Sequence, residues 1–93
     1  MSVLAQYFSE IINKVESDPE LVSNQGKDEN GFYKPVRTIL LRHLNLLRDL
    51  NEKPLAKPML KTAWEFVKEH LPPEHLKLTP EQKIALKKML ESA

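Results

Sequence analysis

Three histidines are the side chains whose type could support catalysis or metal binding, because imidazole binds transition metals and titrates near neutral pH. His70 and His75 lie five residues apart across a diproline, and a glutamate precedes each of them. Ligands on one helix face lie three or four residues apart, so this spacing does not predict a zinc site. His43 and His70 both fall within apolar helical arcs, which favours boundary histidines that bond one ring nitrogen to a carbonyl oxygen.

The other residues capable of chemistry do not form a catalytic pattern. The chain has no cysteine, so a thiol nucleophile, a disulfide framework and a cysteine-ligated zinc site are excluded. No serine is flanked by the glycines of a nucleophile elbow, and Gly26 and Gly31, the two glycines, fit neither a dinucleotide motif nor a P-loop. We therefore expect no catalytic residue, no metal site and no cofactor, and the protein is not predicted to be an enzyme.

One polar loop contains Asp28-x-Asn30-Gly31, which resembles the middle of an EF-hand calcium loop. With Gly31 at the sixth position, the first position is Gly26 and the twelfth is Arg37, whereas calcium binding needs an aspartate and a bidentate glutamate there. The motif fails at both ends. Asn30-Gly31 instead predicts a turn, because both residues tolerate positive φ.

Length and composition indicate one globular domain, residues 1–93, with a single core. Hydrophobic residues make up 41% and charged residues 29% of the chain, which is too apolar for a disordered protein. The N-terminal segment lacks the basic and continuous apolar regions of a secretory signal, and no segment approaches the roughly 20 apolar residues of a membrane span. We expect a cytoplasmic protein that does not bind membranes.

The net charge of +1 conceals a segregation of charge along the chain. Residues 1–33 contain six acidic and two basic side chains, a net charge of −4, whereas residues 34–93 contain twelve basic and seven acidic ones, a net charge of +5. Such segregation can steer a charged partner. It can equally let the two halves of one fold attract each other, and this second interpretation is the one we favour.

The longest helical pattern covers residues 35–51, and the other elements are expected to pack around it. At about 100° per residue, its apolar residues form an arc of roughly 160° with His43 in the middle. They are Val36, Ile39, Leu40, Leu44, Leu46, Leu47 and Leu50. An arc of this width can contact two neighbouring helices.

Three further helices are predicted from apolar spacing and from start and stop signals. They cover residues 2–16, 58–71 and 80–91, and Thr79 with Gln82 forms a capping box before the last one. The apolar face of the third is expected to bury Met59, Leu60, Ala63, Trp64, Phe66, Val67 and Leu71. No strand pattern is found. The sequence predicts an all-α fold, a compact bundle of about four helices in a single domain.

The candidate binding site is a stripe on the polar side of the central helix, formed by Arg37, Leu41, Asn45 and Arg48 and called the basic stripe below. Its spacings of four, four and three residues point all four side chains the same way. A leucine flanked by arginines is typical of binding hot spots. The alternative is that a neighbouring helix covers the leucine and the arginines extend along its edge. A second surface places Ile84 among Lys83, Lys87 and Lys88, where a single apolar residue on a solvated face is the favoured interpretation.

The sequence therefore favours a small helical interaction module, an adaptor, regulator or accessory subunit, that binds a protein partner with an acidic and apolar surface. The alternative partner is nucleic acid, bound by the basic residues after Tyr33: Lys34, Arg37, Arg42, Arg48, Lys83, Lys87 and Lys88. Against it, these residues are spread around their helices, and the seven-residue connection after the central helix is too long for a helix-turn-helix. A homo-oligomer with Leu41 or Ile84 at a two-fold interface is compatible with either function.

Overall fold

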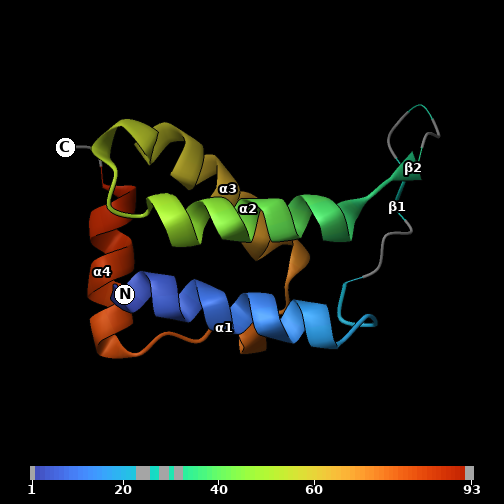
Figure 1. Cartoon of the computed structure of the whole chain (residues 1–93), viewed down its shortest axis with the longest axis horizontal. Coiled ribbons are helices and arrows are strands. Elements are labelled where there is room, and N and C mark those ends of the chain that lie inside the picture. The colour runs from blue at the N-terminus through green and yellow to red at the C-terminus, as the bar shows by residue number, and fades with distance from the viewer. Residues whose placement is uncertain (1, 23–25, 28–29, 31–32, 92–93) are drawn as a thin grey trace.

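The computed structural model describes residues 2–22, 26–27, 30 and 33–91. In order along these ranges lie the helices α1 (Val3–Ser17), α2 (Val36–Leu50), the 3₁₀ helix η1 (Pro54–Ala56), α3 (Lys57–His70), the 3₁₀ helix η2 (Pro73–His75) and α4 (Pro80–Leu90). Figure 1 shows α1 and α2 side by side, α3 crossing behind α2, and α4 standing across one end of the pair. The predicted all-α bundle is confirmed. None of these helices is long and apolar enough to span a membrane.

The four α-helices begin and end within one residue of the predicted ranges. Ser2 caps α1, because its hydroxyl oxygen accepts a hydrogen bond from the Ala5 backbone N–H at 3.0 Å. Before α4, the Thr79 hydroxyl accepts from the Gln82 N–H at 3.1 Å and the Gln82 side chain accepts from the Thr79 N–H at 2.8 Å. This is the predicted capping box. Helix α3 ends at His70, two residues before the diproline, because proline cannot continue the backbone hydrogen bonds of a helix.

Helix α2 is the central element, as its wide apolar arc predicts. Leu40, Leu44 and Leu47 are fully buried, and the helix packs against both α1 and α3. The remaining apolar residues of its arc are half-buried at the edges of these two contacts. This arrangement follows from the single helix that has apolar residues on two sides.

An aromatic cluster joins α1 to α3 inside the core. The ring centroids of Tyr7 and Phe8 lie 5.1 Å apart, those of Phe8 and Trp64 lie 6.0 Å apart, and both pairs meet edge to face. Each such pair contributes about 0.5–1.5 kcal/mol beyond its buried area. The Tyr7 hydroxyl donates a hydrogen bond to the backbone oxygen of Leu76 at 2.9 Å. That bond fixes the connection between α3 and α4 against α1.

Between α1 and α2 the chain forms a short antiparallel ladder that the sequence does not predict. The strands β1 (Gly26–Lys27) and β2 (Tyr33–Lys34) pair in the register Gly26 with Lys34 and Lys27 with Tyr33. Two residues per strand are too few to show the alternation of apolar and polar residues that predicts a strand. The pairing gives hydrogen-bond partners to backbone N–H and C=O groups of the two antiparallel segments. The turn predicted at Asn30-Gly31 falls partly outside the described residues.

One residue that the sequence assigns to the core, Met59, lies at the surface instead. Met59, placed on the apolar face of α3 by its spacing, is 50% exposed. It lies in the first turn of α3, which begins at Lys57. Leu60, the next residue, is fully buried and belongs to the stripe that faces the core. Helical spacing ranks neighbouring apolar residues equally, and only the neighbouring helices decide which of them is covered.

Candidate partner-binding surface

Arg37, the first residue of the basic stripe, binds the end of another helix. Its Nη2 donates hydrogen bonds to the backbone oxygens of Val15 at 3.0 Å and Glu16 at 3.2 Å. These carbonyls belong to the last turn of α1, where no intrahelical donor remains and the helix dipole is negative. Arg37 therefore ties the start of α2 to the end of α1, a structural role that needs no partner protein.

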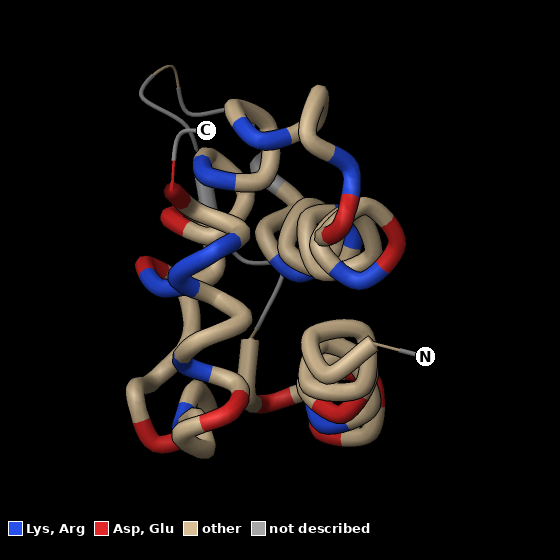
Figure 2. The backbone as a smooth tube through the Cα atoms, turned by 90° about the vertical axis from the view of Figure 1, so that its left-hand side faces the viewer, with Lys and Arg blue, Asp and Glu red and all other residues tan. Residues whose placement is uncertain are grey.

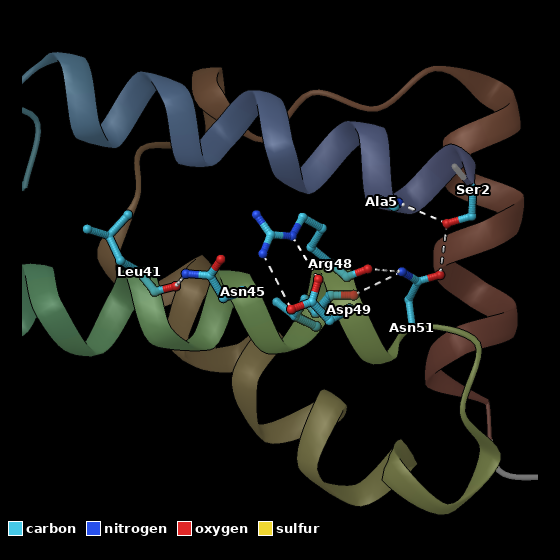
Figure 3. A network of polar contacts seen from close by, with 8 residues as sticks. Ser2, Ala5, Leu41, Asn45, Arg48, Asp49 and Asn51 are labelled. Carbon is cyan, nitrogen blue, oxygen red and sulfur yellow. Dashed lines mark hydrogen bonds and ion pairs between the residues drawn. The ribbon is translucent and has the colours of Figure 1, made fainter.

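The other residues of the basic stripe also have contacts within the protein, shown in Figure 3. Leu41 is partly buried and packs against the core. The Asn45 side-chain amide donates a hydrogen bond to the backbone oxygen of Leu41 at 2.8 Å. Arg48 Nε donates to Asp49 Oδ1 at 2.8 Å, and this hydrogen bond lowers the pKa of the Asp49 carboxyl. Figure 3 shows Leu41, Asn45 and Arg48 on the side of α2 that faces α1, and the hydrogen bonds of Arg37 place its side chain against the end of α1. Partner binding by the basic stripe stays a prediction.

Two residues that the sequence did not single out join α1 and α2 at their other ends. The Ser2 hydroxyl donates to Asn51 Oδ1 at 3.1 Å. The Asn51 amide in turn donates to the backbone oxygens of Leu47 at 3.1 Å and Arg48 at 2.7 Å, which lie in the last turn of α2 (Figure 3). The start of α1 and the end of α2 are thereby held together at the end of the bundle that α4 covers.

A cleft of about 640 Å³ opens at this end of the bundle, between α1, the connection from α2 to α3, and α4. We call it the end cleft. Its apolar lining is formed by Val3, Leu4, Pro54, Ala85 and Met89, and its charged lining by Glu52, Lys53, Lys57 and Lys88. Figure 2 looks at this end and shows blue bands of Lys and Arg on α4 and on the connection between α2 and α3. Three lysines and one carboxylate give the end cleft a positive charge.

The three lysines of the end cleft differ in their contacts. Lys57 Nζ donates to the backbone oxygen of Glu91 at 2.6 Å, so it joins the start of α3 to the end of α4. Lys53 and Lys88 are exposed, and neither forms an ion pair with a carboxylate in the described part of the chain. Their charges are therefore free to attract an anionic group at the edge of the cleft.

A second hollow, of about 390 Å³, lies on the opposite flank of α4. We call it the α4 groove. Leu78, Leu86 and Leu90 line it together with Lys83, Lys87 and the carboxylate of Glu91. It is the more apolar of the two hollows, and its lysines lie at its edge. Lys87 has only a distant ion pair with Glu91, at 3.9 Å.

Exposed apolar residues accompany both hollows. Ile84 is 61% exposed, as its position among lysines predicts, and lies on the outer ridge of α4 between the two flanks. Leu55 is 98% exposed and follows Pro54, which lines the end cleft. A single exposed apolar residue is ordinary on a protein surface. Here two of them stand beside hollows that are themselves apolar.

The histidines occupy the boundary positions that the sequence predicts. His43 and His70 stack on the two sides of Phe66, with ring centroids 4.7 and 4.1 Å from it. His43 Nδ1 lies 2.8 Å from the Ile39 oxygen, and His70 Nδ1 lies 2.9 Å from the Phe66 oxygen. Because a carbonyl only accepts, each Nδ1 carries the proton in this bond. Both rings are thus fixed by their own helices.

A polar hollow of about 290 Å³ lies between α1 and the start of α4. Tyr7, Glu10, Lys14, Glu74 and His75 are among its lining residues. Burial raises the pKa of Tyr7 to about 12. His75 Nε2 lies 3.6 Å from the Glu74 carboxylate. Among the residues that the structure describes, no three His, Asp or Glu side chains are grouped to hold a metal ion.

The fold and these surfaces define a small all-α domain with a positively charged, apolar end. No family model matches the sequence, and no curated protein or solved structure is significantly similar to it.

Proposed function

We propose that this protein is a small helical interaction module, without catalytic activity of its own, that binds an acidic and partly apolar surface of a partner protein at the end cleft. One observation carries the proposal. The end cleft combines an apolar lining with three lysines and a single carboxylate, and two of these lysines, Lys53 and Lys88, have no carboxylate partner in the described part of the chain. An anionic partner would supply the missing counter-charge.

The two properties of the cleft have separate roles in such a contact. Burial of apolar side chains supplies most of the affinity of a protein interface. The lysines around the cleft steer an acidic partner toward it and reject a basic one. The basic stripe is a weaker candidate for the same role, because Arg37 and Arg48 already bind oxygens of this protein.

Nucleic acid remains the alternative partner, and Lys83, Lys87 and Lys88 on α4 are the basic residues that favour it. A phosphate backbone is bound by cationic and polar side chains, and an apolar lining contributes nothing to such contacts. Two of the arginines that the sequence offered for phosphate binding, Arg37 and Arg48, are engaged within the protein. We therefore favour a protein partner over nucleic acid, and the experiment below distinguishes the two.

The proposal is tested by affinity capture from lysate with three matched baits, each with and without nuclease. The baits are the wild-type protein, the end-cleft variant Lys53→Glu with Lys88→Glu, and a control, Lys61→Glu with Lys68→Glu, in which two exposed lysines of α3 carry the same change of charge. Circular dichroism and thermal unfolding establish that all three are folded. The comparison isolates the end cleft from the net charge of the protein.

We expect a defined protein that survives nuclease, is retained by the wild type and by the control, and is lost with the end-cleft variant. Equal retention by all three baits would overturn the end cleft as the binding site. Retention that disappears with nuclease would replace the protein partner by nucleic acid. Recovery of this same chain alone would indicate a homo-oligomer.

A further inference from the structure

The two hollows on α4 belong to one surface. At about 100° per residue, Ala85 and Lys88 project toward one flank of α4, where they line the end cleft. Leu86 and Leu90 project toward the other flank, where they line the α4 groove. Ile84 stands on the ridge between them and is 61% exposed. A partner segment that crosses the outer face of α4 would therefore contact apolar side chains at the end cleft, at Ile84 and at the α4 groove.

Lysines accompany this apolar surface on both flanks. Lys88 lies at the end cleft and Lys83 and Lys87 at the α4 groove, and all three are exposed. Glu91 is the one carboxylate that lines the α4 groove beside them, so the three lysines leave a net positive charge beside the apolar surface of α4. The complementary partner has an apolar stripe between acidic residues, which is the pattern of an acidic amphipathic helix.

The backbone of this end of the protein favours a helix over an extended segment as the bound element. One way in which an extended peptide binds is by adding a strand to an exposed sheet edge. In the described part of the chain the only strands are β1 and β2, which lie at the end of α2 opposite to α4 (Figure 1). The outer face of α4 instead offers ridges of side chains three and four residues apart, which accept the ridges of a second helix.

Resting on the proposed function, we propose that the partner's bound element is an acidic amphipathic helix that crosses α4 and places apolar side chains in both the end cleft and the α4 groove. Its carboxylates pair with Lys88 on one flank and with Lys83 and Lys87 on the other. The end cleft alone would be a single anchor. The addition of the α4 groove gives the contact a direction across α4.

The test uses a synthetic peptide of roughly 15 residues, long enough to form a helix when bound. Its leucines recur at three- and four-residue steps and glutamates flank them. Two control peptides replace either the glutamates by glutamine or the leucines by alanine. Binding to the full-length protein is measured by calorimetry, and the amides that the peptide perturbs are located by NMR.

Two variants address the flanks separately. Ala85→Phe fills the end cleft with a larger apolar side chain and leaves the charge unchanged. Lys83→Glu with Lys87→Glu reverses the charge beside the α4 groove, and Lys61→Glu with Lys68→Glu on α3 is its matched control. Amide spectra show whether each variant keeps the native fold.

We expect the peptide to perturb amides on both flanks of α4, each flank variant to weaken binding at least about fivefold, and the α3 control to change it less than about twofold. Both control peptides should bind more weakly. Perturbation of one flank only, or wild-type affinity in either flank variant, would overturn the inference.

The outcome separates this inference from the proposed function. If proteins are captured in a manner that depends on Lys53 and Lys88 while the peptide does not bind, the acidic helix is overturned and the interaction module stands. If capture is also indifferent to these lysines, both are overturned. A peptide that binds equally well with glutamine in place of glutamate would exclude the charge pairing.

Discussion

Ser2 and Asn51 are 49 residues apart in the chain, and the hydroxyl of the first donates to the side-chain oxygen of the second at 3.1 Å. Each of them also caps its own helix, since Ser2 accepts the Ala5 N–H and Asn51 donates to two carbonyls of the last turn of α2. The same two side chains therefore supply hydrogen bonds to the start of α1 and to the end of α2, and they join these two helix ends to each other. Both residues line the end cleft, so the stability of α1 and the shape of the proposed binding site depend on one contact.

This pair predicts a measurable coupling. Ser2→Ala removes the cap of α1 and should lower the free energy of unfolding by about 1 kcal/mol. In a double-mutant cycle with Asn51→Ala we expect a coupling energy of about 0.5 kcal/mol or more, measured by urea denaturation. Ser9→Ala, in the middle of α1, is the control and should change stability by less than about 0.5 kcal/mol. Strictly additive effects of the two substitutions would mean that the contact between them contributes nothing.

Arg37 should be important for stability whether or not a partner is present. Arg37→Gln removes a half-buried guanidinium that binds two carbonyls at the end of α1, and a hydrogen bond to a charged group contributes about 1.5–3 kcal/mol. We expect a loss of about 1–2 kcal/mol in the free energy of unfolding. Arg42→Gln, an exposed arginine of the same helix, is the control. Equal stabilities of the two variants would return Arg37 to the set of candidate partner-binding residues.

Thr79 should control the order of α4. Thr79→Ala breaks the capping box, because the hydroxyl that accepts the Gln82 N–H is lost, and should lower stability by about 1 kcal/mol. The first turn of α4 should then exchange its amide hydrogens faster than the rest of the helix, as followed by NMR. Thr62→Ala, inside α3, serves as the matched control and should leave exchange in α4 unchanged. Unchanged exchange in the Thr79 variant would show that packing, and not the cap, fixes the start of α4.

Tyr7 should make the protein sensitive to alkaline pH. Burial raises the pKa of Tyr7 to about 12 in the folded state, above the value of about 10 in the unfolded chain. The unfolded state loses this proton first, so the associated stability is complete below about pH 10 and is lost as pH rises toward 12. At about 1.4 kcal/mol per pKa unit, the rise of two units corresponds to a loss of about 3 kcal/mol above pH 12, of which roughly half should appear by pH 11.

The alkaline effect is isolated by comparing the wild type with Tyr7→Phe in urea denaturation at several pH values between 8 and about 11. The phenylalanine variant keeps every other titratable side chain of the protein. The difference between the two proteins therefore reports Tyr7 alone. A constant difference across the whole range would show that the Tyr7 pKa does not change on folding.

The helices were predictable because their signals are local. Leu40, Leu44 and Leu47 recur at steps of four and three and are all fully buried, and the capping box at Thr79 needs only four consecutive residues. Prolines end α3 by removing backbone donors, whatever surrounds them. Met59 shows the limit of this reasoning, since its spacing is as good as that of Leu60 and yet half of it is exposed.

The surfaces were less predictable because each depends on several elements. The sequence placed Lys88 on a solvated face and gave no role to Lys53. The end cleft forms only when the start of α1, the connection after α2 and one flank of α4 meet. In the same way, Arg37 looks free on a helical projection of α2, and it is the end of α1 that supplies its acceptors.

By itself the sequence determined that this protein is an all-α bundle with a central helix, where its helices start and stop to within one residue, and that His43 and His70 lie at apolar boundaries. These features depend on residues within a few positions of one another, so backbone geometry suffices to predict them. Only the tertiary structure decided which polar residues would satisfy helix ends and which lysines would gather around a cleft. Those outcomes depend on residues brought together from distant parts of the chain, and no local spacing encodes their separation in space.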